Sequence, residues 1–292
     1  MDKDLTILFL GARRCGKTSI LSAMTTLLSS TSGAISVQGD DFSSRKMRSC
    51  MEKMRDIFSE ENLSNEFWLD DEEGTYDINK YKFTVNVHDP ETTRIYKDVA
   101  PVFSFGMTCI DIPGEVLKNT SDEWSSKYNI VTEYIKTADV LIIAIDSPQL
   151  VENGKQGAVK NCTETITETI MSSLPENIAE VDKLVIYIPV KCEKYFHSQG
   201  GFTINSVNDK IKKRYKDLMD FLHRNTKCRQ VIVPVLTLGD LEFKCFNTKE
   251  GTEKTYFEYT GNKNYSPRYC EQPLLYSIDY YISKNIAQWS NG

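Results

Sequence analysis

Residues 11–19 read GARRCGKTS and follow the apolar run LTILFL, and they contain phosphate-binding residue types at the spacing GxxxxGK[ST]. In such a loop the backbone amides converge on a phosphate, and the next helix directs its positive end at the anion. Lys17 would reach the β- and γ-oxygens, and the Thr18 hydroxyl would bind Mg²⁺. The alternative is a glycine-rich turn that binds nothing. The expected phosphate site consists of Gly11, Ala12, Arg13, Arg14, Cys15, Gly16, Lys17, Thr18 and Ser19.

A second motif, DIPG, ends the apolar segment FSFGMTCIDI and contributes Asp111 and Gly114 at the spacing DxxG. Taken alone, such a tetrapeptide is equally well explained as a chain reversal at a strand end. It follows a phosphate loop, however, and it precedes a further apolar segment, ADVLIIAID, at 138–146. This order favours a nucleotide site.

With these motifs in this order, most of the chain resembles the TRAFAC branch of P-loop GTPases, which includes the Ras-like proteins. The resemblance implies GTP and GDP as ligands with Mg²⁺, Asp111 as the support of the metal, and Gly114 as the sensor of the γ-phosphate. It extends to IPVKCE at 188–193 and PVLTLG at 234–239, which implies a base site. The residues so implied are Lys191, Glu193, Thr237 and Leu238.

Three residues depart from the family's pattern. Val190 replaces the usual Asn or Thr, and Glu193 replaces the Asp that accepts from guanine, so guanine preference over adenine is an expectation. The alternative is that VKCEKY is a strand end that runs into a charged loop. Glu115 stands where Ras-like proteins carry the Gln that orients the attacking water, and its charge near the γ-phosphate is unfavourable unless a cation lies beside it.

The resemblance also implies a Mg²⁺-binding threonine just before the strand expected at 81–87. Thr75, within EGTYD, is the best positional match, whereas Thr92 and Thr93 follow that strand. A threonine in a flexible acidic loop without a metal role is an equal alternative, because switch segments carry little sequence pattern.

Two adjacent arginines lie in the phosphate loop, where small residues are common. We hypothesise that Arg13 neutralises Glu115, supplies positive charge to the γ-phosphate, or blocks an arginine from a partner; Glu115, Arg13 and Lys17 would then form the catalytic group. Alternatively, both arginines point to solvent or pair with the acidic run at 70–73. Cys15 is interpreted as a packing residue, although the helix N-terminus beside it would lower its pKa and permit a redox switch.

The elements that must position these residues alternate between strands and helices. Apolar strands are expected at 5–10, 81–87, 105–112, 140–145, 184–190 and 231–236, and amphipathic helices at 19–28, 47–58, 124–135, 166–174, 207–222 and 274–289. This alternation predicts an α/β, Ras-like fold with a mostly parallel sheet of about six strands and helices on both faces. The strands at 81–87 and 105–112 form the one expected antiparallel pair. We expect one domain over 1–292, with insertions at about 29–77 and 241–269; the second is interpreted as a hairpin over one end of the sheet, or as a partner surface.

Composition limits the classes of function. A net charge of −6 over 292 residues argues against nucleic-acid binding, and the basic residues of 210–216 are interpreted as a solvated helix face. The eight cysteines are scattered, and no run approaches the ~20 apolar residues of a membrane span, so we expect a cytoplasmic chain.

The expected function is slow GTP hydrolysis in a regulatory switch with a protein effector. PVKCEKY and CEQPLLY also resemble bacterial double-GTPases of conflict or defence clusters, which implies a second GTPase as partner. The alternatives are a nucleotide-holding scaffold without turnover and a P-loop ATPase or kinase.

Overall fold

The computed structural model describes most of the chain. The described residues are 4–29, 34–56, 67–68, 77–88, 101–117, 122–152, 154–175, 181–196, 203–224, 227–239, 241–247, 253–259 and 265–289. Within them, no helix combines the length and the apolar character needed to cross a membrane.

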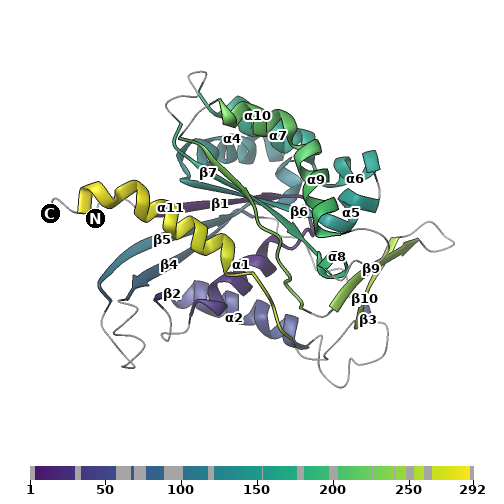
Figure 1. Ribbon diagram of the computed structural model, residues 1–292, viewed down its shortest axis with the longest axis horizontal. Helices are drawn as coiled ribbons and strands as arrows, with labels where there is room; N and C mark the ends of the chain where they lie inside the picture. Colours follow the sequence, from purple (N-terminus) through teal and green to yellow (C-terminus); the bar gives the residue numbers. More distant parts are fainter. Residues whose placement is uncertain are drawn as a thin grey trace.

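A seven-stranded sheet forms the centre of the molecule, with the strand order β2-β4-β5-β1-β6-β7-β8 (Figure 1). The five strands from β5 to β8 in this order are parallel, whereas β4 pairs antiparallel with both β5 and β2. The strands are β1 (Leu5–Gly11), β2 (Ile35–Gly39), β4 (Asn79–Val87), β5 (Phe103–Asp111), β6 (Val140–Asp146), β7 (Leu184–Val190) and β8 (Arg229–Ile232).

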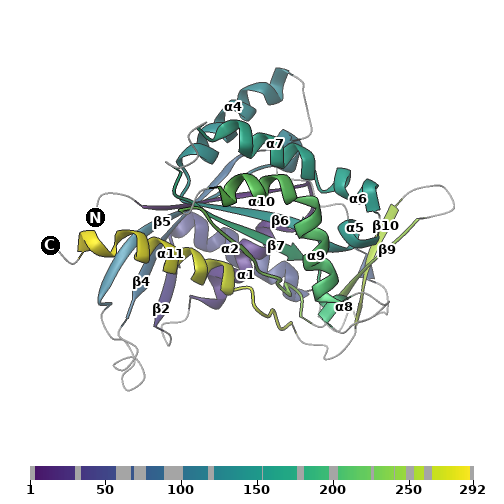
Figure 2. The same ribbon diagram turned by 45° about the horizontal axis from the view of Figure 1, so that its top comes forward.

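Helices cover both faces of this sheet, as Figure 2 shows from a second direction. One face carries α1 (Lys17–Leu27), α2 (Asp41–Asp56) and α11 (Gln272–Trp289), and the other carries α4 (Asp122–Thr137), α7 (Thr163–Ser173), α9 (Ile204–Arg214) and α10 (Lys216–His223). Strand β1 separates the two cores, because neighbouring side chains of a strand point to opposite faces. Ile7 and Phe9 pack with the first group of helices, and Leu8 and Leu10 with the second.

The predicted α/β, Ras-like fold is confirmed, including its antiparallel pair, β4 with β5. The sheet has one strand more than expected, because β2 adds a second antiparallel pair at the β4 edge. Its five residues are too few to show a periodic pattern in the sequence.

Several predicted bounds were wrong, among them the start of the helix expected at 47–58, which begins at Asp41, and two of the differences have a clear physical reason. The strand expected at 231–236 ends at Ile232, because Pro234 has no amide hydrogen for the ladder, although Val233 and Val235 still donate to Tyr187 and Pro189. The helix expected at 207–222 is two helices, α9 and α10, that meet at Tyr215. The apolar stripe continues through Tyr215 because its side chain is fully buried.

A small second sheet lies beside the short helix α8 (Glu193–Phe196) in Figure 1. Its strands, in the order β3-β10-β9, are β3 (Phe67–Trp68), β9 (Leu241–Asn247) and β10 (Glu253–Tyr259). Strands β9 and β10 pair antiparallel as a hairpin, the form expected for the second insertion. Whether that hairpin also binds a partner stays a prediction.

Candidate functional site

The candidate site lies at the end of the sheet formed by the carboxyl ends of the parallel strands. Register pairs Phe9 with Asp111, Gly11 with Ala144, and Asp146 with Val190. The phosphate loop, the DIPG turn and the loops after β6 and β7 therefore leave the sheet side by side. In open α/β sheets, ligands bind at these carboxyl ends of the strands.

The phosphate loop joins β1 directly to α1. Gly16 has φ 96°, a left-handed conformation in which an L side chain is strained, and its carbonyl accepts from the amide of Ile20 in the first turn of α1 at 2.9 Å. Arg14 also has a positive φ, 59°, which is uncommon for a residue with a side chain. The loop thus curls its backbone over the N-terminus of α1, as an anion site requires.

Lys17 is buried and faces back into the loop. Its Nζ atom donates to the carbonyl oxygens of Gly11 and Ala12, at 3.0 Å each. A buried ammonium group needs such acceptors to offset the loss of its water. The positive charge therefore sits inside the loop, next to the backbone amides that would hold a phosphate.

The Thr18 hydroxyl donates to Oδ2 of Asp111 at 2.7 Å and so connects the two phosphate-site motifs. Asp111 is almost fully buried, and its Oδ1 atom has no hydrogen-bond partner within the described residues. Burial raises the pKa of this carboxyl, while the charge of Lys17 and the bond from Thr18 oppose the increase. An unpartnered buried carboxylate oxygen beside a hydroxyl fits Mg²⁺, which prefers hard oxygen ligands.

Gly114 begins a short 3₁₀ turn, η2 (Gly114–Leu117), that lies directly on the phosphate loop. A Cβ atom on Gly114 would be 2.1 Å from the amide nitrogen of Arg13 and 2.5 Å from the carbonyl carbon of Ala12. Only a glycine therefore permits this approach of the two backbones.

Arg13 and Glu115 form an ion pair across this contact, with Nε 2.8 Å from Oε1. The pair is not aligned as a hydrogen bond, since neither carboxylate oxygen of Glu115 has a hydrogen-bond partner among the described residues. Glu115 is mostly buried, and the Arg13 side chain is 36% exposed. Of the hypotheses for Arg13, neutralisation of Glu115 has this contact in its favour; residues 70–73 lie outside the described part of the chain.

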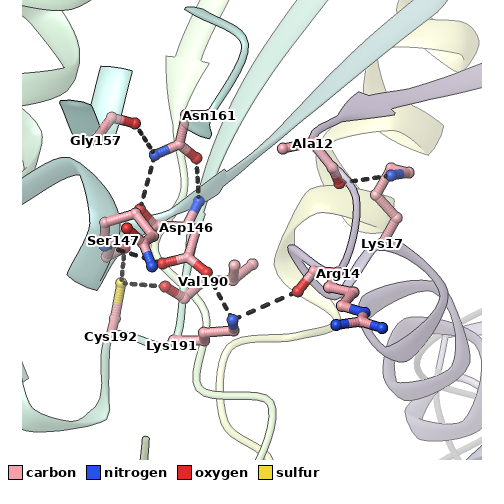
Figure 3. A network of polar contacts seen from close by, with 11 residues as sticks. Ala12, Arg14, Lys17, Asp146, Ser147, Gly157, Asn161, Val190, Lys191 and Cys192 are labelled. Carbon is pink, nitrogen blue, oxygen red and sulfur yellow. Dashed lines mark hydrogen bonds and ion pairs between the residues drawn. The ribbon is translucent and has the colours of Figure 1, made fainter. Parts of the chain in front are cut away.

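Lys191, which the resemblance assigns to the base, bonds to the end of β6 and to the phosphate loop. Its Nζ atom donates to Oδ2 of Asp146 at 2.6 Å and to the carbonyl oxygen of Arg14 at 3.4 Å (Figure 3). Asp146 ends β6, and Lys191 follows the last residue of β7. This pair therefore links the loops after β6 and β7 to the phosphate loop.

Glu193 opens α8 and is buried, with 2% of its surface exposed. Its Oε1 atom accepts from the amide of Leu238 at 3.3 Å. Thr237 is buried beside Leu238. Of the residues that the resemblance assigns to the base, Glu193 and Leu238 are thus in contact, through a hydrogen bond from the backbone amide to the carboxylate.

Two other expectations have clear outcomes. Cys15 is buried, and burial raises its thiol pKa, so the expected lowering by the helix N-terminus is wrong. Its Sγ atom would lie 2.9 Å from a Cβ on Gly11, in agreement with a packing role. Thr75, Thr92 and Thr93 lie outside the described residues, and Ser19 is half-buried in α1.

Sequence reasoning missed Asp146 and Asn161. Asp146 is visible in the sequence as a carboxylate at the carboxyl end of an apolar strand, the usual place for site residues in a parallel sheet. Asn161 carries no such signal, because it lies between two helical segments and approaches the edge only through packing.

A family model described as ABC transporter matches residues 1–112, which include the phosphate loop and Asp111. The match covers less than half of the chain and so does not assign it to that family. A search of the curated proteins finds no match.

Among solved structures, the signal recognition particle receptor SRb-GTP/SRX complex from Chaetomium thermophilum is 11% identical, with a TM-score of 0.43 over 82% of this chain and 94% of that chain. The Ski7 GTPase-like domain of S. cerevisiae, bound to GTP, is 16% identical, with a TM-score of 0.43 over 95% of this chain and 50% of that chain. A bacterial selenocysteine-specific elongation factor is 13% identical, with a TM-score of 0.34 over 79% of this chain and 26% of that chain. Similarities this weak carry no functional argument, so the function has to be inferred from the residues themselves.

Proposed function

We propose that this chain binds GTP and GDP together with Mg²⁺ and slowly hydrolyses GTP to GDP and phosphate. One observation carries the proposal: the Thr18 hydroxyl and the buried Asp111 carboxylate meet at 2.7 Å beneath a phosphate loop, and the second oxygen of Asp111 has no partner among the described residues. That arrangement provides oxygen ligands for a divalent cation where the β- and γ-phosphates would lie.

Each residue of the loop has a distinct role in this proposal. The backbone amides and Lys17 hold the phosphates, and Thr18 with Asp111 would hold Mg²⁺, which neutralises phosphate charge when bound. Thr75 is the proposed additional metal ligand from the switch segment. Gly114 brings the amide of the DIPG turn close to the loop, where it can sense the γ-phosphate.

Glu115 is assigned the role of orienting the attacking water. Its carboxylate has no aligned hydrogen-bond donor among the described residues, so it has the capacity to accept one from water. Arg13, at 2.8 Å, offsets the negative charge that Glu115 would otherwise place near the γ-phosphate. Hydrolysis then proceeds by in-line attack, with the loop amides and Lys17 stabilising the charge of the transition state.

The base is assigned to Lys191 and Glu193, with Thr237 and Leu238 beside them. The aliphatic stem of Lys191 would lie over the purine, and the Glu193 carboxylate would accept from guanine N1 and N2 after exchanging its bond with the Leu238 amide. The proposed role is a cytoplasmic switch that acts on a protein partner. A second GTPase in a bacterial conflict system is the partner that the resemblance favours.

The decisive experiment is titration of the purified chain with GTP, GDP, ATP and ADP, with and without Mg²⁺, together with phosphate release. We expect tighter binding of the guanine nucleotides, strengthened by Mg²⁺, and slow release of phosphate from GTP. Preference for ATP would support a P-loop ATPase or kinase instead.

A second candidate is a nucleotide-holding scaffold that does not turn over. It is favoured by the Arg13–Glu115 pair, which ties the only proposed water-orienting group to the loop, and by Val190 and Glu193 in the base motif. Under this alternative, GTP bound to the chain would remain intact over hours. Phosphate release would equal the background measured in buffer without protein, and substitution of Glu115 would not change it.

A further inference from the structure

Asn161, between α6 (Gly154–Lys160) and α7, is fully buried, and its side-chain amide bonds both to the end of β6 at Asp146 and to α6. Its Oδ1 atom accepts from the Asp146 amide at 2.8 Å, and its Nδ2 atom donates to the Asp146 carbonyl at 3.1 Å (Figure 3). Nδ2 also donates to the carbonyl oxygen of Gly157 at 3.1 Å. The amide group thus clamps the end of β6 by bonding to both the amide and the carbonyl of Asp146.

The clamp leaves the carboxylate of Asp146 free to hold two further groups. Oδ1 accepts from the amide of Gln149 at 3.0 Å, in the first turn of α5 (Ser147–Glu152), and Oδ2 accepts from Lys191 at 2.6 Å. Every polar atom of Asp146 therefore has a partner. The bond from Gln149 holds the side chain in the orientation in which its other oxygen meets the Lys191 ammonium group.

Close packing places Asn161 against this strand. A Cβ on Gly157 would lie 1.6 Å from the carbonyl oxygen of Gln149, so the backbones of α5 and α6 touch as only a glycine allows. Cys162, the next residue, has φ 55°, a left-handed conformation that turns the chain from α6 into α7. The segment of α5 and α6 therefore holds Asn161 rigidly beneath the end of β6.

Backbone strain marks the same network. Four residues other than glycine have positive φ in the described part of the chain, and three of them belong here: Arg14, Lys191 and Cys162. Strained conformations of this kind persist where the surroundings over-determine them, and they gather at functional sites. The left-handed turn at Lys191 aims its side chain at Asp146 and at the Arg14 carbonyl (Figure 3).

We infer that Asn161 is a positioning residue for nucleotide binding: it fixes Asp146, which holds Lys191 between the base site and the phosphate loop. The inference rests on the proposed function, because Lys191 is there assigned to the base. Asn161 itself is too deeply buried to touch a ligand. We expect its effect to pass through Asp146 to Lys191, and this would distinguish it from a residue that only supports the fold.

A double-mutant cycle tests this path. The variants are Asn161→Ala, Lys191→Ala and the pair combined, with Asn129→Ala in the exposed face of α4 as the matched control. Dissociation constants are measured for a fluorescent GDP derivative, and for inorganic tripolyphosphate by competition, both with Mg²⁺. Thermal melting checks that each variant is folded, and Asn161→Asp, which keeps an acceptor for the Asp146 amide, replaces Asn161→Ala if the latter does not fold.

We expect the Asn161 variant to weaken GDP binding about tenfold, which is the scale of one lost positioning contact of about 1.4 kcal/mol. Tripolyphosphate, which has no base, should lose less than about threefold, and Asn161→Ala should add little once Lys191 is already alanine. The inference would be overturned if a folded Asn161 variant had the wild-type dissociation constant for GDP. It would also be overturned if the fold-losses in affinity of Asn161→Ala and Lys191→Ala multiplied in the double variant. Either result would leave the proposed function intact. A wild-type chain that binds no guanine nucleotide would overturn both.

Discussion

The Nε atom of Arg13 lies 2.8 Å from Oε1 of Glu115, and this contact joins the phosphate loop to the turn that follows Asp111. The two residues come from segments that are about a hundred positions apart in the sequence. Because the Arg13 side chain is about a third exposed, the pair adds little to stability. Its consequences are expected in the chemistry of the site.

Removal of the Arg13 side chain should slow GTP hydrolysis. Arg13→Ala leaves the charge of Glu115 uncompensated next to the γ-phosphate, so we expect the single-turnover rate to fall by about tenfold or more. Arg13→Lys, which keeps the charge but not the guanidinium, should be intermediate. Arg45→Ala, at an exposed position of α2, is the control for a loss of charge alone. An unchanged rate in Arg13→Ala would contradict a catalytic role.

The contact at Gly114 should be intolerant of any side chain. Gly114→Ala forces a Cβ to within 2.1 Å of the Arg13 amide, so the turn or the loop has to move. We expect a loss of about 1–3 kcal/mol in the free energy of unfolding, measured with denaturant. Gly16→Ala is the comparison, since a Cβ there meets nothing within 4 Å and only the left-handed backbone is strained. A Gly114→Ala chain of full stability would show that the two backbones are not in contact.

Thr18 should control the dependence of nucleotide binding on Mg²⁺. Thr18→Ala removes the hydroxyl and leaves Asp111 without its 2.7 Å hydrogen bond, so the stabilisation of bound GDP by Mg²⁺ should be mostly lost. Thr18→Ser keeps the hydroxyl and should retain the effect. Comparison of GDP dissociation constants with Mg²⁺ and with a chelator gives the answer, and equal Mg²⁺ dependence in both variants would exclude Thr18 as a ligand.

Glu193 should determine the preference for guanine. Glu193→Ala removes the only carboxylate assigned to the base, and the ratio of ATP to GTP dissociation constants should fall by about tenfold, since a hydrogen bond to a charged group is worth about 1.5–3 kcal/mol. Glu193→Asp introduces the residue that the GTPases of the resemblance carry and should keep the preference. The measurement is competition of both nucleotides for the same fluorescent probe. A ratio that stays constant in Glu193→Ala would assign base recognition elsewhere.

The thiol of Cys15 should be unreactive near neutral pH. Burial raises its pKa, so the group remains a neutral thiol in a pH range where an ordinary cysteine begins to ionise. Alkylation by iodoacetamide, followed at the Cys15 peptide by mass spectrometry, should be slower in the folded chain than in the unfolded chain at pH 8, and it should rise only at higher pH. Rapid labelling of the folded chain at pH 7 would instead support a redox switch.

Local patterns in the sequence predicted most of the sheet. Strands β1, β6 and β7 are nearly continuous apolar runs, and β5 alternates apolar with small or polar residues; both patterns are typical of buried strands. The small strand β2 was missed because five residues at a sheet edge carry little pattern. The break at Tyr215 was missed because burial of that side chain preserves the helical period across two helices.

The sequence by itself determined the phosphate loop and the motif at Asp111, because both depend on short-range spacing within one strand, one turn and one helix. Tertiary structure alone decided that Arg13 faces Glu115, that Glu193 bonds to Leu238, and that Asn161 supports Lys191 through Asp146. Each of these contacts joins segments that only the sheet order brings together. A spacing along the chain encodes local backbone geometry, whereas the meeting of two distant side chains depends on how whole helices and strands pack.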